Sequence, residues 1–135
     1  MVERERRLRR SYEVRQTRSK GRPFADGPLI ARIRRNPAHP DLNRYAVVAG
    51  KSVGGAVDRN RLKRLVREAV RHLDSGFSAG HDIVIIIRGR RDELPSLSEA
   101  VAVLTRIARR AGLLSASGEA DRTARPTAST RDTIS

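Results

Sequence analysis

The segment over residues 50–71, GKSVGGAVDRNRLKRLVREAVR, holds the densest set of side chains that could bind phosphate. Its opening, Gly50-Lys51-Ser52, matches the end of a P-loop, the glycine-rich turn that wraps nucleotide phosphates. That motif needs another glycine five residues earlier, where this chain has Tyr45. After Ser52 the sequence continues VGG, so no helix begins where a P-loop requires one. We therefore predict no nucleotide-hydrolysing P-loop.

Other catalytic constellations are weak. The three histidines, at positions 39, 72 and 81, lack metal-ligand spacing and are interpreted as surface or capping residues. Glu68 and Asp82 are interpreted as charge partners of nearby arginines rather than as an acid and a base. The chain has no cysteine, which excludes disulfides, thiolate catalysis and cysteine-based zinc sites. We therefore predict neither a catalytic residue nor a metal site on the protein.

The net charge indicates an anionic partner. The 135 residues include 29 Lys and Arg against 15 Asp and Glu, a formal charge of +14. Nucleic acid is the commonest partner for such a charge, and an anionic membrane is the second. No apolar run is long enough to cross a membrane, and the N-terminus lacks the apolar core of a secretory signal. We therefore expect a soluble, cytoplasmic protein.

A basic amphipathic helix is predicted from about Val57 to His72. Its apolar stripe recurs at helical spacing and consists of Leu62, Leu65, Val66, Ala69, Val70 and Leu73. The opposite face carries Asn60, Arg64, Arg67 and Arg71, flanked by Arg61 and Lys63. Like charges at this spacing repel one another unless phosphates neutralise them, and Glu68 is the single acidic neighbour of the row. Arg59 stands at the helix entrance, where its side chain can reach back over the glycine turn.

Strands are predicted on both sides of this helix. Residues 28–34 alternate between apolar and polar types, which is typical of a half-buried strand whose second face carries Arg32 and Arg34. Residues 44–50 form a second predicted strand. Residues 83–87 are apolar without alternation, as expected of a central strand that is covered on both faces.

Two further helices are predicted. A short one over SYEVRQTRSK is stopped by Gly21. A longer one begins at the capping box formed by Ser96 and Glu99 and ends at Gly112. From about residue 115 the chain has almost no large apolar side chains, so the tail cannot offset its ordering entropy and is expected to be disordered.

The segment over residues 50–71 resembles the signature of the bacterial ribonuclease P protein component. The matching positions are Lys51, Gly54, Ala56, Val57, Arg59, Asn60, Arg61, Lys63, Arg64, Arg67, Glu68 and Arg71. A weaker resemblance extends from about Leu8 to Leu114 and includes DIVIIIR as the Asp-led central strand of that family. The resemblance implies that eight of these residues bind RNA: Lys51, Arg59, Asn60, Arg61, Lys63, Arg64, Arg67 and Arg71.

The resemblance also implies a fold class. It predicts an α/β fold of the α+β sandwich type, with a central and mostly antiparallel sheet. An N-terminal helix, a basic helix in a left-handed βαβ crossover and a C-terminal helix surround this sheet. The chain would comprise a flexible basic N-terminus over residues 1–7, an RNA-binding domain over residues 8–114 and a disordered tail over residues 115–135.

The function that the resemblance implies is that of a protein subunit in a ribonucleoprotein endonuclease. Ribonuclease P removes the 5′ leader of precursor tRNA, and its RNA subunit is the ribozyme that holds Mg²⁺, so the protein alone needs no cofactor. The implied partners are the RNA subunit and precursor tRNA, with neither DNA nor a membrane among them. The leader would lie in a cleft between the first helix and the sheet, with Tyr12, Arg15 and Ser52 as its residues.

Three alternatives stay open at this point. Tyr12 could instead pack against the sheet as a core residue, because aromatic side chains are valuable to a small core. The chain could be a ribosomal or RNA-chaperone protein outside any enzyme. A helix-turn-helix protein that binds DNA is a third possibility, but such a protein needs a helix and a tight turn before its recognition helix. Residues 45–53 instead have the character of a strand.

Overall fold

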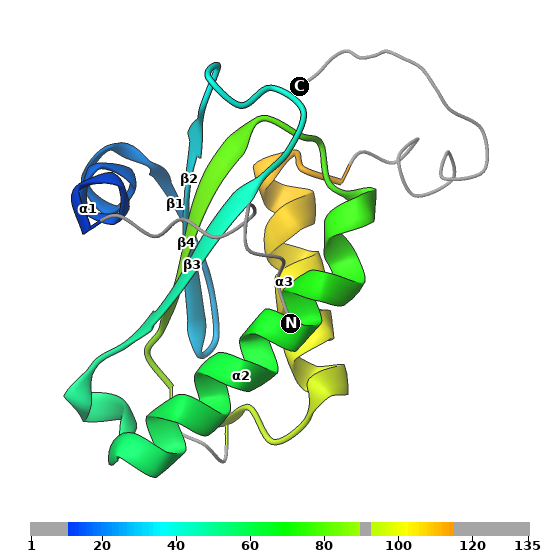
Figure 1. Cartoon of the computed structure of the whole chain (residues 1–135). Helices are drawn as coiled ribbons and strands as arrows, with labels where there is room; N and C mark the ends of the chain where they lie inside the picture. Colours follow the sequence, from blue (N-terminus) through cyan, green and yellow to red (C-terminus); the bar gives the residue numbers. More distant parts are fainter. Residues whose placement is uncertain (1–10, 90–92, 115–135) are drawn as a thin grey trace.

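Figure 1 shows the computed structural model of the chain, which describes residues 11–89 and 93–114. Its helices and strands follow in the order α1 (Ser11–Lys20), β1 (Arg22–Asp26), β2 (Leu29–Arg35), β3 (Arg44–Ala49), η2 (Lys51–Val53), α2 (Ala56–Leu73), η3 (Asp74–Gly76), β4 (His81–Ile87) and α3 (Leu97–Ala111). The flexible N-terminus predicted over residues 1–7 and the disordered tail predicted over residues 115–135 lie outside the described residues.

The four strands form one mixed sheet in the order β1-β2-β4-β3. β2 pairs antiparallel with β1 and with β4, whereas β3 and β4 are parallel neighbours. The chain passes from β3 to β4 through α2, so the basic helix is the crossover between the two parallel strands. The structure therefore confirms the α+β fold with a mostly antiparallel sheet, and it confirms residues 83–87 as a central strand.

The helices cover the two faces of the sheet unequally. α2 and α3 lie together on one face, and α1 lies on the other (Figure 1). Leu29 and Ala31 of β2 point into the core beneath α2 and α3, whereas Arg32 and Arg34 alternate with them and face α1. The predicted alternation of β2 therefore separates a packed face from a basic face. Within the described ranges, no helix is long and apolar enough to cross a membrane.

The two long helices begin and end much as predicted. The buried residues of α2 are Leu62, Val66, Ala69 and Val70, and the remaining apolar positions of the stripe pack at the edge of the core. In α3 the Ser96 hydroxyl accepts a hydrogen bond from the backbone N–H of Glu99 at 3.3 Å. Gly112 ends that helix in the left-handed conformation. Side-chain periodicity and capping residues therefore locate both helices correctly.

β1 was not predicted from the sequence. It pairs with β2 so that Asp26 lies opposite Leu29, and the tight turn between them has Gly27 at φ 54°. Asp-Gly is a strong hairpin signal, but Arg22 and Pro23 gave the segment before it little strand character. α3 also holds this hairpin, because Arg106 pairs with the Asp26 carboxylate at 3.0 Å.

Gly21 places α1 directly on the sheet. A Cβ atom at this position would lie 2.5 Å from the Thr17 carbonyl oxygen and 2.9 Å from the backbone nitrogen of Ile33. The Gly21 carbonyl oxygen in turn accepts a hydrogen bond from Arg32 Nη1 at 3.1 Å. The predicted helix stop is therefore also the point at which the chain turns from α1 into the edge of the sheet.

Candidate nucleic-acid interface

The outward face of α2 is the first candidate site. The helix packs one side against α3 and β3, and its polar residues follow on the side away from the core. Four of the predicted RNA-binding residues of α2 are exposed and three are half-buried: exposed Asn60, Arg61, Arg64 and Arg71, and half-buried Arg59, Lys63 and Arg67. The structure therefore places the predicted row on one accessible helix surface, which we call the α2 row.

Within α2, Glu68 neutralises the C-terminal end of the α2 row. Glu68 accepts hydrogen bonds from Arg71, with Arg71 Nε at 3.2 Å, and lies 3.5 Å from His72 Nε2. The hydrogen bonds from Arg71 lower the pKa of Glu68 to about 2, so this carboxylate is ionised at neutral pH. Elsewhere in the α2 row, the side chains of Arg61 and Arg64 make no hydrogen bond or ion pair with another described residue. Arg61 and Arg64 therefore keep their charge available for phosphate.

The α2 row continues into the turn before the helix. Lys51 and Ser52 are exposed residues of η2, which contacts the beginning of α2 and is anchored by the buried side chain of Val53. Because η2 follows β3 directly, both side chains lie at the end of that strand. The structure thus brings Lys51 and Ser52 together with the N-terminal part of the α2 row.

On the other face of the sheet, a chain of charged contacts joins α1 to the strands. Arg44 donates hydrogen bonds to both oxygens of Asp82, each at 3.1 Å, and to the Glu13 carboxylate at 3.3 and 3.4 Å. Asn36 Nδ2 donates to Asp82 at 2.9 Å. Burial lowers the pKa of Arg44, but the hydrogen bonds and charges of Asp82 and Glu13 outweigh it and raise that pKa. This network fixes the first turns of α1 over the starts of β3 and β4.

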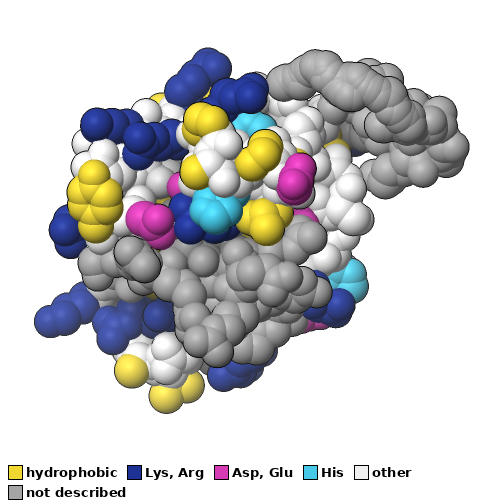
Figure 2. All heavy atoms as spheres, turned by 45° about the horizontal axis from the view of Figure 1, so that its top comes forward, with side chains coloured by type: hydrophobic (Ala, Val, Ile, Leu, Met, Phe, Trp, Pro, Cys, Tyr) yellow, Lys and Arg dark blue, Asp and Glu magenta, His cyan; other side chains and the backbone are white. Residues whose placement is uncertain are grey.

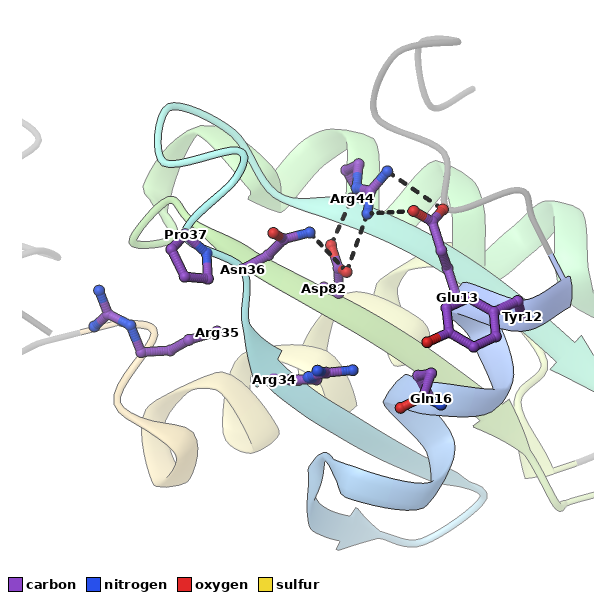
Figure 3. A pocket seen from close by; sticks show the side chains of 9 residues that line it. All are labelled: Tyr12, Glu13, Gln16, Arg34, Arg35, Asn36, Pro37, Arg44 and Asp82. Carbon is purple, nitrogen blue, oxygen red and sulfur yellow. Dashed lines mark hydrogen bonds and ion pairs between the residues drawn. The ribbon is translucent and has the colours of Figure 1, made fainter.

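A hollow of about 200 Å³ adjoins this network (Figure 3). It is lined by residues of α1, of the end of β2 and the loop after it, and of the starts of β3 and β4: Tyr12, Glu13, Gln16, Arg34, Arg35, Asn36, Pro37, Arg44 and Asp82. We call it the Tyr12 hollow. The Tyr12 side chain is 63% exposed, so the alternative that Tyr12 is a core residue is wrong. Arg15 is also exposed on α1 but does not line the hollow.

Basic side chains cluster on the surface of the molecule. On the face shown in Figure 2, Lys and Arg side chains gather in groups, and the acidic side chains lie singly. Among the described residues, no three His, Asp or Glu side chains gather closely enough to hold a metal ion. The geometry therefore favours binding of a polyanion.

Comparison with known proteins agrees with this geometry. The family profile Ribonuclease P matches residues 2–111. The chain belongs to this family. A ribonuclease P protein component from Roseiflexus sp. (strain RS-1) is 38% identical over 122 residues, which cover 85% of this chain and 94% of that protein. One from Clostridium acetobutylicum is 38% identical over 84 residues, covering 62% of this chain and 71% of that protein.

Solved structures of ribonuclease P proteins have the same fold. The protein from Thermotoga maritima matches with a TM-score of 0.65 and 28% identity, over 77% of this chain and 94% of that chain. The Staphylococcus aureus protein matches with a TM-score of 0.70, over 82% of this chain and 98% of that chain. At 22% identity this second likeness shows the fold alone.

Membership of the ribonuclease P family confirms the predicted function. The chain is a protein subunit of ribonuclease P, acts in tRNA processing and works with the ribonuclease P RNA. The comparisons do not favour the ribosomal or RNA-chaperone alternative. The helix-turn-helix alternative is wrong, because the residues before α2 form the strand β3 and the turn η2 instead of a helix.

The predicted leader cleft of this ribonuclease P protein is not one compact group. Tyr12 lies near the start of β3, because its neighbour Glu13 contacts Arg44, whereas Ser52 lies beyond Ala49 at the end of the same strand. Arg44 and Ala49 are five residues apart along β3, a distance of about 17 Å. The structure therefore separates Tyr12 and Arg15 from Ser52 by the length of a strand.

An apolar part of the sheet lies between these two groups. Ile30, Ala46, Val48 and Ile86 share the sheet face that carries α1, and all four are half-buried. We call them the open sheet face. Sequence reasoning missed these residues and missed Arg34 and Asn36 of the hollow as well. The one signal for these residues was the alternation of β2, which predicted that the sheet has a second, basic face. It did not show which helix covers that face.

Proposed function

We propose that this subunit binds the ribonuclease P RNA through the α2 row and holds the 5′ leader of precursor tRNA against the open sheet face. The RNA subunit then carries out the endonucleolytic cleavage. The observation that carries the proposal is the α2 row itself, where Arg61 and Arg64 point away from the core without a partner among the described residues. Such a row is stable beside phosphates, which neutralise its mutual repulsion.

The length of the α2 row suits a stretch of RNA backbone. From Asn60 to Arg71 the helix rises by about 17 Å. Each phosphate that a Lys or Arg neutralises releases condensed counterions, which makes the affinity depend steeply on salt. Asn60 adds an amide that can both donate and accept hydrogen bonds, which suits a base edge or a ribose 2′-hydroxyl.

The open sheet face suits an unpaired strand rather than a duplex. Its four half-buried apolar residues offer an apolar surface to bases that are not stacked in a helix, and recognition of RNA by proteins commonly uses such single strands. Lys51 and Ser52 stand at the edge of this face, where they can contact the sugar-phosphate backbone. A leader that crosses the sheet would therefore pass from α1 toward the beginning of α2.

The Mg²⁺ that the reaction uses belongs, in this proposal, to the RNA subunit. Asp82 and Glu13 are already engaged by Arg44, so they are poor candidates for a hard cation that needs free oxygen ligands. The protein side chains therefore bind and position RNA, and the metal chemistry is left to the RNA subunit.

Reconstitution tests this function. The full chain is mixed with a bacterial ribonuclease P RNA, and the cleavage of precursor tRNA is measured at low Mg²⁺ with and without the protein. We expect the protein to raise kcat/KM for a precursor with a leader of several nucleotides. A protein that binds the RNA but leaves kcat/KM unchanged for every precursor would contradict the proposal.

A further inference from the structure

Val57 is an apolar side chain that the fold leaves in water. It is 80% exposed in the first turn of α2. Val53, four residues earlier, is buried and anchors η2 to the core, so the two valines of this turn have opposite surroundings. A β-branched residue also has a lower helix propensity than alanine or arginine. Packing within the described part of the chain therefore does not account for a valine at this position.

Helical geometry places Val57 on the outward face of α2. At 100° per residue, Asn60, Arg61 and Arg64 lie within about 60° of Val57 around the helix axis. All three are exposed. Val57 thus continues the α2 row by one turn toward the N-terminus, but as an apolar member. A partner that covers Arg61 and Arg64 therefore also meets Val57.

The location of Val57 distinguishes it from an ordinary exposed apolar residue. Single apolar side chains are common on protein surfaces and need no explanation by themselves. The neighbours of Val57, however, are cations that the proposed function assigns to RNA. The positive end of the helix dipole disfavours Lys or Arg in the first turn, but serine or threonine meets that condition as well. A branched apolar side chain at this place matches an apolar part of the partner.

RNA offers apolar surface mainly at the faces of its bases. In a duplex these faces are covered by stacking, and the A-form major groove is too narrow for protein side chains. Unpaired bases in loops and bulges expose their faces and stack on protein side chains. A phosphate does not suit Val57, because a charged group must stay hydrated or hydrogen-bonded and a methyl group provides neither.

We propose that Val57 packs on the face of an unpaired base of the ribonuclease P RNA, while Arg61 and Arg64 bind the phosphates beside it. This inference rests on the proposed function, because it assumes that the α2 row binds that RNA. It adds a contact that depends on shape and hydrophobicity rather than on charge. The α2 row then recognises an unpaired nucleotide as well as a stretch of backbone.

Substitutions that change hydrophobicity at constant charge test this contact. We expect Val57→Ala to weaken the affinity for the RNA subunit about five- to tenfold, because two methyl groups are lost. The slope of log K against log[salt] should stay unchanged, since no phosphate contact is lost. Val57→Thr keeps the shape but replaces one methyl group by a hydroxyl, and it should weaken binding about threefold. Val57→Ile is the matched control and should retain the affinity of the parent.

Three results would overturn the proposal. Equal or tighter binding by Val57→Thr would mean that a phosphate or a ribose hydroxyl faces this position. Equal affinities of Val57→Ala and the parent would mean that nothing packs on the side chain. An affinity loss accompanied by a lower melting temperature would assign Val57 to the stability of the fold.

Photocrosslinking identifies the RNA surface, because the chain has no cysteine of its own. Val57→Cys is labelled on its thiol with an aryl azide, and the crosslinked nucleotides of the RNA subunit are mapped by primer extension. We expect crosslinks to unpaired nucleotides. His39→Cys is the control, since this exposed residue lies between β2 and β3, at the other end of the sheet from η2. Crosslinks confined to paired nucleotides, or the same crosslinks from both positions, would overturn the assignment to an unpaired base.

This inference and the proposed function fail in different ways. If Arg61→Ala with Arg64→Ala flattens the salt slope while Val57→Ala binds like the parent, the apolar contact is rejected and the proposed function stands. Failure of the unmodified chain to bind the RNA subunit rejects the proposed function itself.

Discussion

Arginines on the two sides of this molecule have opposite surroundings. Arg44, beneath α1, has a side chain that is 12% exposed and is hydrogen-bonded to two carboxylates. Arg64, on the outer face of α2, is exposed and has no partner among the described residues. The same side chain thus joins elements of the fold in one region and is available to a partner in the other.

The difference follows from the cost of removing a charge from water. A guanidinium that α1 and the sheet shield from solvent is stable only with acids at hydrogen-bond distance, and Glu13 and Asp82 supply them. A guanidinium that remains in water needs no such partner within the fold. Exposed arginines without acidic neighbours are therefore the better guide to the RNA surface than the number of arginines.

The largest expected effect is the loss of stability when the buried arginine, Arg44, is replaced. Arg44→Ala leaves the Asp82 carboxylate, whose side chain is 9% exposed, with Asn36 as its remaining side-chain donor. We expect the free energy of unfolding to fall by about 3–5 kcal/mol, measured by urea denaturation. Glu13→Gln removes the more exposed partner and should cost about 1 kcal/mol or less. Equal losses would show that Arg44 does not anchor the network.

The next effect compares two apolar positions of α2, one in the core and one at its edge. Leu62 is 1% exposed in the core, so Leu62→Ala should lower the free energy of unfolding by about 2–5 kcal/mol. Leu65 is half-buried at the edge of the core, and Leu65→Ala should cost less. Thermal melts of the two variants measure the difference. A larger loss for Leu65→Ala would mean that the helix is rotated about its axis relative to this structure.

The exposed arginines of α2 are tested by the salt dependence of binding to the RNA subunit. Arg61→Ala with Arg64→Ala should change stability by no more than about 0.5 kcal/mol. It should flatten the plot of log K against log[salt] for binding to the RNA subunit by roughly 0.7–0.9 for each lost phosphate contact. Arg106→Ala is the control, because that arginine is engaged by Asp26. The same flattening in the control would contradict the distinction between engaged and free arginines.

The smallest effect concerns His81, next to the buried network. Burial lowers the pKa of His81, and a hydrogen bond to the Ser78 carbonyl partly opposes this. The unfolded chain therefore binds the proton at higher pH than the folded one, so stability is full above about pH 6.5 and falls as the pH drops through the lower folded pKa. Urea denaturation between about pH 7 and pH 5 should show a flatter profile in His81→Asn. An identical profile in His81→Asn and the parent would contradict this role of His81.

The parts of the fold that follow a local pattern were predicted well. The apolar stripe of α2 and the capping box of α3 depend on residues three or four positions apart, which one turn of helix brings together. The Arg44 network joins residues 31 and 38 positions apart, and the Arg106 contact spans 80 positions. No short window of sequence contains both partners, so these contacts could not be predicted from local patterns. The β1 hairpin is local, but Arg22 and Pro23 hid its first strand.

The sequence by itself determined that this chain carries a basic helix with one apolar face and a family signature along its polar side. Helical periodicity and charge are properties of neighbouring residues, so both can be predicted from the sequence without knowledge of the fold. Only the tertiary structure decided which arginines are engaged and which are free, and it placed Tyr12 and Ser52 at opposite ends of β3. Those outcomes depend on which strands pair and on where Gly21 places α1 on the sheet. Both bring together residues that are far apart along the chain, so local sequence patterns do not reveal them.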